Sequence, residues 1–469
     1  MMWTALLLSR VQFAFTVSFH IIFPSFTIGV AAWLTVLETF HLISGKPVYR
    51  RLFEFWLKIF GVTFGLGVVS GIVLAFEFGM NWSRLSEVTG PIQGPLLTYE
   101  SFTAFALEAS FFGVLLFGRN RVTPLVYLLS TMMVALGTTF SAFWIMVNNS
   151  WMQAPVGYVV QNGVFVPTDW EAIIFSPVVW VRFPHMLIAA YLTGAFCVAA
   201  TGAWYRLRGI YAAEGRVMLR MGLFLAALLI PVQLFLGHLN GDYVHDWQPA
   251  KFAAIEGRWH DEQPAGEVLI AIPDEARETN HFELKIPYLG SLIASMRLNS
   301  RETGLTSFAP EDRPPVAIPF FTFRVMVGCG LLMMAVAWLG SFYLLFERKP
   351  GRRLLLWATF LSFPLPFIAT LTGWFTAEVG RQPWSVYGAL RTADAVTPTL
   401  SVQAVTISLI IFVVVYVVIF SFGTLYVYRL LKVGPVESQP SHPLNPKRPL
   451  GVSGGGNSIV KTTQEGAWL

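Results

Sequence analysis

The stretch VQAVTISLIIFVVVYVVIFSF, residues 402–422, carries no charged side chain. It is long enough to cross a lipid bilayer as a helix, which takes about 20 mostly apolar residues. Eight further stretches of the same kind precede it in the chain. The nine predicted spans cover approximately residues 11–40, 52–80, 95–118, 122–147, 180–205, 217–238, 318–346, 354–375 and 401–430. The sequence therefore predicts an all-α integral membrane protein with about nine transmembrane helices.

The composition of the 469 residues excludes the other broad classes of protein. Hydrophobic residues make up 55% of the chain and charged residues only 13%, about half of the roughly 25% found in soluble globular domains. A disordered chain would contain far less apolar residue. Cys197 and Cys329 both lie inside apolar runs, which excludes a disulfide framework.

The lysine and arginine residues predict the orientation of the spans. Nineteen of the 32 lie at or beside the connections that follow spans one, three, five and seven, or in the C-terminal tail. Basic residues gather on the cytoplasmic side of membrane proteins. We therefore expect the N-terminus outside and the C-terminus in the cytoplasm. The net charge of +5 then reflects topology, and no nucleic-acid partner is expected.

The longest polar segment, residues 239–317, is predicted to be an outer loop between helices six and seven. It holds 13 acidic and 7 basic residues and shows no obvious periodicity; connections of this length are commonly functional or disordered. The sequence thus predicts a transmembrane domain over residues 1–432, which includes this loop, and a mobile cytoplasmic tail over 433–469.

Few ionisable or metal-ligating side chains fall inside the predicted spans. Such groups are costly in a bilayer and mark ion paths, cofactor ligands or counter-ions. Counted along the helices, the candidate ligands lie in the outer half of the membrane. These candidates are His20, Glu100, His185, Met326 and Glu378. Glu38 and Glu77 are expected to be interfacial.

His185 and Met326 form the most informative pair. Axial ligation of haem iron by His and Met favours electron transfer over oxygen binding. A lone membrane histidine can equally be a packing residue, and most of the 14 methionines fill the core. The residues alone leave this pair open. No CxxCH motif is present, which excludes a covalently attached haem.

Glu100 and Glu108 lie eight residues apart in the third predicted span. This spacing puts them about 80° apart around a helix, with Glu108 roughly 12 Å deeper. Glu108 is a candidate proton relay, or equally a neutral carboxyl hydrogen-bonded to a neighbouring helix. Ser141 in span four is a weaker relay candidate, because a hydrogen bond to its own helix backbone is the favoured reading.

Eight segments, in order along residues 5–432, carry a family resemblance. The chain resembles subunit I of the cytochrome bd-type quinol oxidases, including the cyanide-insensitive branch. The segments are SRVQFAFTVSFHIIFPSFTIG (9–29), FGVTFGLGVVSG (60–71), FGMNW (78–82), LEASFFG (107–113), WMQ (151–153), KFAAIEG (251–257), FRVMVGCG (323–330) and GWFTAEVGRQPW (373–384).

The resemblance implies a set of haem ligands. His185 and Met326 would be the axial ligands of a low-spin haem b, and Arg324 would stabilise the charge of that haem. His20 and Glu378 would be axial ligands in a dihaem oxygen-reducing centre that holds a high-spin haem b and either a haem d or, in its place, a second haem b. Which of the two residues holds which haem stays open.

The resemblance also implies the residues around these haems. Glu100 would lie beside the dihaem centre or ligate it, and Trp374 would lie between the cofactors. Arg381 would lie near a haem propionate. Glu108, with Ser141, would belong to the proton route. The long loop corresponds to the short version of the family's Q-loop, where Lys251 and Glu256 would bind quinol and accept its proton.

The implied protein is an electrogenic quinol:oxygen oxidoreductase in the bacterial cytoplasmic membrane. It would oxidise ubiquinol or menaquinol at the outer side and reduce O2 to water with protons from the cytoplasm, without pumping. Moving one charge through 100 mV stores roughly 2.3 kcal/mol. The implied partners are a second membrane subunit (subunit II), small single-helix accessory subunits and the lipid bilayer.

Two other classes remain as alternatives at this point. A multi-pass ion channel or transporter would line its pathway with buried Glu and His, but the chain shows no internal repeat. A dihaem anchor of a quinol dehydrogenase would need further paired histidines on facing helices, and the chain has only 8 His. The stretch GRWHDEQPA (257–265) departs from better-known family members and leaves inhibitor preference open.

Overall fold

The computed structural model describes residues 4–346 and 352–436. Within these residues, nine helical segments are long and apolar enough to cross a membrane, as predicted. They are α1 (Ala5–Ser44), α2 (Pro47–Met80), α3 (Ser83–Thr103) continued by η1 (Ala104–Ala109) and α4 (Ser110–Phe117), α5 (Pro124–Gln153), α6 (Trp170–Ile174) with α7 (Val179–Leu207), α8 (Ala212–Trp247), α11 (Ala317–Leu345), α12 (Arg352–Leu361) with α13 (Leu365–Val379), and α14 (Val402–Val433). The predicted tail lies outside the described residues, except for its first four.

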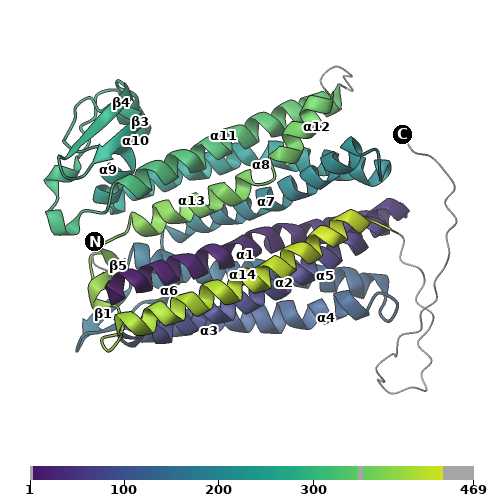
Figure 1. Ribbon diagram of the computed structural model, residues 1–469, viewed down its shortest axis with the longest axis horizontal. Helices are drawn as coiled ribbons and strands as arrows, with labels where there is room; N and C mark the ends of the chain where they lie inside the picture. The colour runs from purple at the N-terminus through teal and green to yellow at the C-terminus, as the bar shows by residue number, and fades with distance from the viewer. Residues whose placement is uncertain (1–3, 347–351, 437–469) are drawn as a thin grey trace. The chain divides into compact units, whose positions relative to one another are not determined.

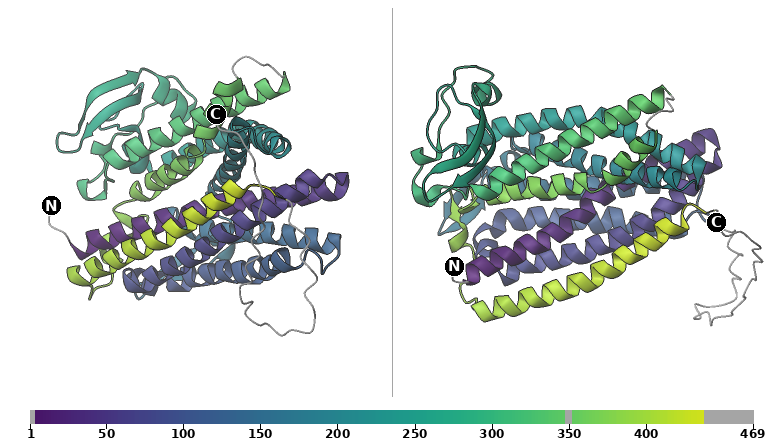
Figure 2. Two further views of the ribbon diagram at one scale, coloured as in Figure 1. Left: turned by 45° about the vertical axis from the view of Figure 1, so that its right-hand side comes forward. Right: turned by 45° about the horizontal axis from the view of Figure 1, so that its top comes forward.

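Most of the long helices lie side by side, with α14 next to α1 and α2 (Figure 1). The connections at one end of these helices contain three antiparallel hairpins. They are β1 (Tyr158–Gln161) with β2 (Val164–Pro167), β3 (Glu267–Asp274) with β4 (Thr279–Ile286), and β5 (Trp384–Val386) with β6 (Leu390–Arg391). Two further views show the β3–β4 hairpin at the end of the bundle where α11 begins (Figure 2).

The long loop is ordered and shorter than predicted. Helix α8 continues to Trp247 and is followed directly by α9 (Pro249–Glu256), the β3–β4 hairpin, α10 (Leu289–Ser295) and the short helices η2 (Leu305–Ser307) and η3 (Pro310–Asp312). The pairing of β3 with β4 shifts register at two places. These shifts break the alternation of side chains by which a strand is found in a sequence.

Helix α3 begins at Ser83, twelve residues before the predicted start of the third span. Its first turns are polar and contain Pro91, so they lack the hydropathy of a typical span. The buried face of α3 carries apolar side chains at helical spacing, namely Leu85, Val88 and Ile92. Glu100 therefore lies near the C-terminal end of α3 and not in its first turn.

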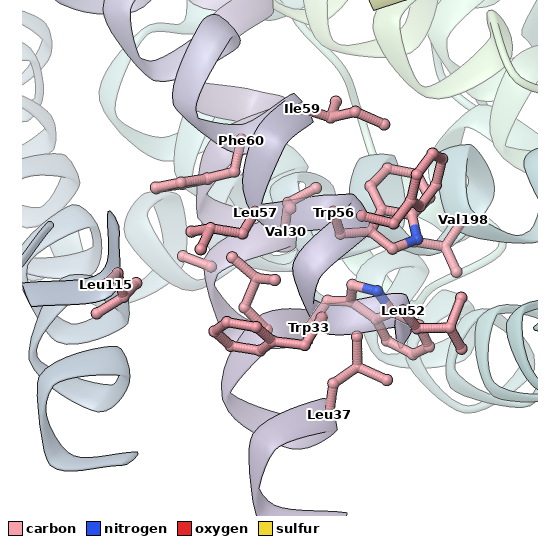
Figure 3. Close-up of a cluster of buried hydrophobic side chains, with 14 of the residues drawn as sticks. Val30, Trp33, Leu37, Leu52, Trp56, Leu57, Ile59, Phe60, Leu115 and Val198 are labelled. Atoms are coloured by element: carbon pink, nitrogen blue, oxygen red, sulfur yellow. The ribbon is translucent and has the colours of Figure 1, made fainter. Parts of the chain in front are cut away.

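A cluster of buried aromatic and aliphatic side chains joins α1, α2, α4 and α7 (Figure 3). Trp33 of α1, Trp56 and Phe60 of α2, Leu115 of α4 and Val198 of α7 meet there. Lipid tails are as apolar as these side chains, so in a bilayer the cluster stabilises the bundle mainly by close packing. Shape therefore matters more here than the area buried.

Two glutamates expected at the membrane interface, Glu38 and Glu77, are buried within the protein. The carboxylate of Glu38 is 1% exposed and accepts two hydrogen bonds from Arg119, at 2.7 and 2.8 Å. Glu77 is 0% exposed and accepts a hydrogen bond of 3.2 Å from the Thr16 hydroxyl. Each carboxyl can leave water because a neighbouring element supplies a donor, and hydropathy alone does not reveal that donor.

Helices α1 and α7 cross at two glycines. A Cβ atom on Gly29 would run into the carbonyl oxygen of Ala190 and would lie 3.0 Å from Cα of Gly194. A Cβ atom on Gly194 would in turn lie 2.9 Å from Cα of Gly29. The two backbones approach this closely only because both side chains are missing.

We expect the substitution Gly29→Ala to destabilise the chain by about 1–3 kcal/mol, because an added methyl group overpacks the crossing of α1 and α7. The matched control is Gly90→Ala in α3, where a Cβ would have no atom within 4 Å. That control should be neutral or slightly stabilising, since Ala favours helix over Gly by roughly 1 kcal/mol. The thermal unfolding temperature in detergent measures both; equal temperatures for the two variants would contradict the prediction.

Candidate functional site

A cavity with a volume of about 460 Å³ lies among α7, α8, α9, α11 and α13. His185 of α7 and Met326 of α11 both line it. The structure therefore places these two candidate ligands on one cavity from two different helices. Such a cavity is typical in size of a site for a small molecule or cofactor, which spans roughly 300–1,000 Å³.

Glycines leave room beside both side chains. A Cβ on Gly373 would lie 3.0 Å from the sulfur of Met326, and one on Gly237 would lie 3.4 Å from Cε1 of His185. The buried Nδ1 atom of His185 has no hydrogen-bond partner among the described residues, and Nε2 lies 3.4 Å from the amide nitrogen of Gln233. An imidazole without a strong partner, a soft thioether and the space that the glycines leave fit a haem.

Helix α9 brings the loop residues to the same cavity. Lys251 and Glu256 line it together with Trp374 of α13. The helix begins with Pro249 and ends at Gly257, which has a φ of +65° and whose Cβ would lie 2.8 Å from the Phe320 ring. Glycine is needed there on both grounds. The predicted quinol-binding residues therefore line the same cavity as His185 and Met326.

Lys251 is buried in a polar pocket. Its Nζ atom donates to the carbonyl oxygen of Ala377 at 2.9 Å and to the side-chain oxygen of Gln153 at 3.2 Å. The pKa of Lys251 is lowered to about 7, chiefly by burial; Arg182 and Arg381 contribute to the lowering, while Glu378 opposes it. Lys251 can therefore gain or lose a proton near neutral pH.

Glu378 lies in a network of donors at the end of α13. Its Oε1 atom accepts hydrogen bonds from Asn149 at 3.0 Å and from Gln153 at 3.1 Å, and Oε2 lies 2.6 Å from Nη2 of Arg381. Arg182 donates to Asn149 at 2.5 Å. A carboxylate has about four lone-pair sites, so these donors orient Glu378 and leave it able to bind iron as well.

His20 is not among the residues that line the large cavity. Its Nδ1 atom is 3.0 Å from the Ser70 hydroxyl, and a Cβ on Gly71 would lie 3.1 Å from its Cε1 atom. His20 is therefore oriented by α2. The described hydrogen bonds and ion pairs do not connect His20 to Glu378 or to Glu100.

Glu100 and Ser141 are brought together by α3 and α5. The Ser141 hydroxyl donates to Oε1 of Glu100 at 3.1 Å. The favoured prediction that Ser141 bonds its own helix backbone is wrong, because a carboxylate is the stronger acceptor. Ser141 therefore remains a candidate for the proton route, together with Glu100.

Glu108 lies in a segment of π-helix, η1, between α3 and α4. It is buried, and a Cβ on Gly137 of α5 would lie 2.7 Å from its Cγ atom. A π-helical turn changes the direction of the side chains that follow it and is frequent at functional sites. The angle of 80° predicted between Glu100 and Glu108 assumed a regular α-helix, and this assumption is wrong for η1.

Arg324 faces the long loop. Its guanidinium donates to the backbone oxygens of Ile255 at 2.8 Å and of Leu269 at 3.0 Å, and also to that of Val268. It also lies over the Phe320 ring, 3.5 Å from the centroid. Arg324 thus ties α9 and β3 to α11, two residues before Met326. Its predicted effect on haem charge remains a prediction.

Sequence reasoning missed four polar residues of this site. They are Asn149, Gln153, Arg182 and Gln248, whose amide donates to the Gln153 backbone oxygen at 2.6 Å. A signal was present, because polar residues cluster at the end of α5 and Arg182 lies inside a span. Their proximity could not be predicted, because these residues come from three segments that are far apart in the sequence.

Comparison with known proteins agrees with this geometry. Residues 8–435 match the family model described as cytochrome bd terminal oxidase subunit I. The chain is similar to cytochrome bd ubiquinol oxidase subunit 1 of Bacillus subtilis (strain 168), with 34% identity over 91% of this chain and 93% of that protein. It is also similar to cytochrome bd-II ubiquinol oxidase subunit 1 of Escherichia coli (strain K12), with 33% identity over 94% of this chain and 99% of that protein.

The fold is also similar to that of a solved structure. The bd oxidase from Geobacillus thermodenitrificans superposes with a TM-score of 0.85 and 28% identity, over 92% of this chain and 99% of that one. The match extends through the nine spans and the long loop. The chain therefore belongs to the cytochrome bd terminal oxidase subunit I family.

Proposed function

We propose that this chain is the haem-binding subunit of a terminal oxidase that oxidises membrane quinol and reduces O2 to water. Family membership makes the chain part of a quinol oxidase and decides against the channel, transporter and dehydrogenase-anchor alternatives. The similar proteins are named as subunits 1 of ubiquinol and menaquinol oxidases, which implies a subunit II partner. The observation that carries the proposal is the cavity shared by His185, Met326, Lys251 and Glu256.

His185 and Met326 would hold a low-spin haem b in that cavity. A haem bound there would supply one-electron transfer, which His/Met ligation favours because it raises the potential of the iron. Trp374 lines the same cavity and would pack between this haem and the others. Arg324 sets the position of Met326 through its contacts with the loop.

Lys251 and Glu256 would bind the quinol. The ammonium of Lys251 would donate a hydrogen bond to one quinol oxygen, and the Glu256 carboxylate would take up a phenolic proton. Both side chains are buried and project from one short helix, so their separation is set by α9. A fixed separation orients a planar ring that carries an oxygen at each end.

His20 and Glu378, with Glu100 beside them, would hold the dihaem centre with a high-spin haem b and a haem d, or a second haem b. Arg381 would reach a haem propionate, since its Nε and Nη1 atoms have no hydrogen-bond partner among the described residues. Arg182 and Lys251 lie close enough to Glu378 to offset its charge. Buried ions of one sign persist only with such partners.

Glu108, Glu100 and Ser141 would carry protons toward this centre. Glu108 is buried beside α5 in the π-helical turn, and Ser141 already bonds Glu100. Carboxyls and hydroxyls in a membrane interior can pass protons along a chain of hydrogen bonds. Protons would enter from the cytoplasm and pass Glu108 before they reach Glu100.

The proposed topology makes the reaction electrogenic in a bacterial cytoplasmic membrane. The N-terminus and the long loop would lie outside and the C-terminus inside, with small accessory subunits beside subunit II. Quinol protons would leave on the outer side, while protons for water would come from inside. This separation stores energy without a pump.

We expect His185→Ala and Met326→Leu each to remove the low-spin haem signal from the reduced-minus-oxidised visible spectrum of purified membranes, because each removes one axial ligand. The control is Met334→Leu on the same helix, which packs in the core and should keep the signal. An unchanged low-spin signal in both ligand variants would rule out this pair.

The substitution Glu108→Gln should lower oxygen consumption about 100-fold, because an amide cannot relay a proton and such groups contribute roughly 10²–10⁴-fold. Glu87→Gln, at an exposed residue of α3, is the control and should leave the rate unchanged. Oxygen uptake and charge separation in liposomes measure the effect. Full uptake with full charge separation in the Glu108 variant would refute the assignment.

We expect Lys251→Met to raise the KM for quinol about tenfold, because it removes a charge-assisted hydrogen bond of roughly 1.5–3 kcal/mol. The exposed Lys58 provides the control substitution Lys58→Met, which should leave KM unchanged. Steady-state quinol oxidation by the whole oxidase measures both. A KM equal to that of the parent enzyme would remove Lys251 from the quinol site.

A further inference from the structure

Two carboxyl groups lie buried side by side in the long loop. Glu256 at the end of α9 is 5% exposed, and Glu267 at the start of β3 is 9% exposed. Arg324 holds the two segments together, because its guanidinium donates to the backbone oxygens of Ile255 and Val268, each the sequence neighbour of one of these glutamates. The two carboxyl groups also interact with each other. The buried Oε2 atom of Glu256 has no donor among the described residues. Two carboxylates cannot bond each other, so a proton held between the two groups is needed to satisfy them.

Four titratable or charged side chains surround Glu267. Glu256 approaches from α9, and Nη2 of Arg324 from α11 lies 3.8 Å from Oε1 of Glu267. Arg258 is buried, with Nε and Nη1 unpaired among the described residues, and Lys285 of β4 pairs with Glu262 instead. Burial and the neighbouring Glu256 raise the pKa of Glu267, and Arg324 and Arg258 oppose this rise.

Glu256 borders two cavities, with Glu267 beside it. Glu256 lines the large cavity with His185 and Met326, and it also lines a second cavity of about 120 Å³. The second cavity is bounded by Gly266 and Val268, on either side of Glu267, and by the exposed residues His260 and Glu283. It therefore reaches the protein surface, whereas the large cavity holds the proposed electron acceptor.

We propose that Glu267 is the partner of Glu256 in a proton relay that leads from the quinol site to the second cavity. The inference rests on the proposed function. When a quinol O–H bond breaks, its proton would pass to the free carboxylate oxygen of the pair, and its electron would pass to the haem held by His185 and Met326. The pair would then release one proton to water in the second cavity and return to its starting state. Glu267 acts through Glu256 and does not touch the quinol.

The test compares Glu267→Gln with Glu267→Asp in the whole oxidase. Glutamine removes the second carboxyl group and with it the shared proton that stabilises the proton-accepting, singly charged form of the pair. We therefore expect the rise of kcat with pH to move about one pH unit higher, and the maximal kcat to fall about tenfold. KM should change less than about twofold. Aspartate should restore the pH profile, and Glu311→Gln, at an exposed residue of the same loop, should leave kcat and the profile unchanged.

A second measurement does not depend on turnover. The infrared difference between low and high pH should contain the C=O band of a protonated carboxyl in the parent enzyme and in Glu311→Gln, and Glu267→Gln should lose it. A parent pH profile and a retained band in Glu267→Gln, with normal haem content, would overturn the relay. Absence of quinol oxidation by the parent enzyme would instead overturn the proposed function, and the infrared result would still decide whether the pair shares a proton.

Discussion

A bilayer offers no hydrogen-bond partners, so each charge among these helices must find its partner within the protein. This constraint explains the pattern of buried groups. Glu38 is held by Arg119 with two hydrogen bonds, and Glu378 lies among Asn149, Gln153 and Arg381. Removing one member of such a pair leaves an uncompensated charge, which typically costs about 3–5 kcal/mol. The polar residues therefore specify which helices neighbour one another, while the apolar ones provide the packing.

The same constraint links the long loop to the cavity that His185 and Met326 line. Arg324 lies in α11, and its guanidinium donates hydrogen bonds to backbone oxygens of α9 and β3. The contact brings Lys251 and Glu256 to the cavity that holds His185 and Met326. Quinol chemistry couples the loss of protons to the loss of electrons, so the base and the acceptor must lie on one site. In this chain Arg324 supports that proximity, together with the hydrogen bonds of Lys251 to Gln153 and Ala377.

Much of the fold followed from local sequence. Uninterrupted apolar runs predicted the number of spans because lipid selects for apolar length alone. Positions where tertiary contacts override hydropathy were missed. The start of α3 at Ser83 is polar but packs against α5, and Glu77 takes its donor from α1. The π-helical turn at Glu108 leaves no periodic pattern in the sequence from which it could be predicted. In the structure it packs closely against Gly137 of α5.

The sequence by itself determined the class of the protein and its number of spans, and it named candidate residues for haem and quinol, because residue type and hydropathy are local properties. Only the tertiary structure decided which of these residues share a site. It placed His185 and Met326 on one cavity with the loop, set His20 of α1 against Ser70 of α2, and brought Glu267 beside Glu256. Such neighbours lie far apart in the chain or on a hairpin of irregular register. Their meeting depends on how helices cross and how buried charges are paired, which no single segment encodes.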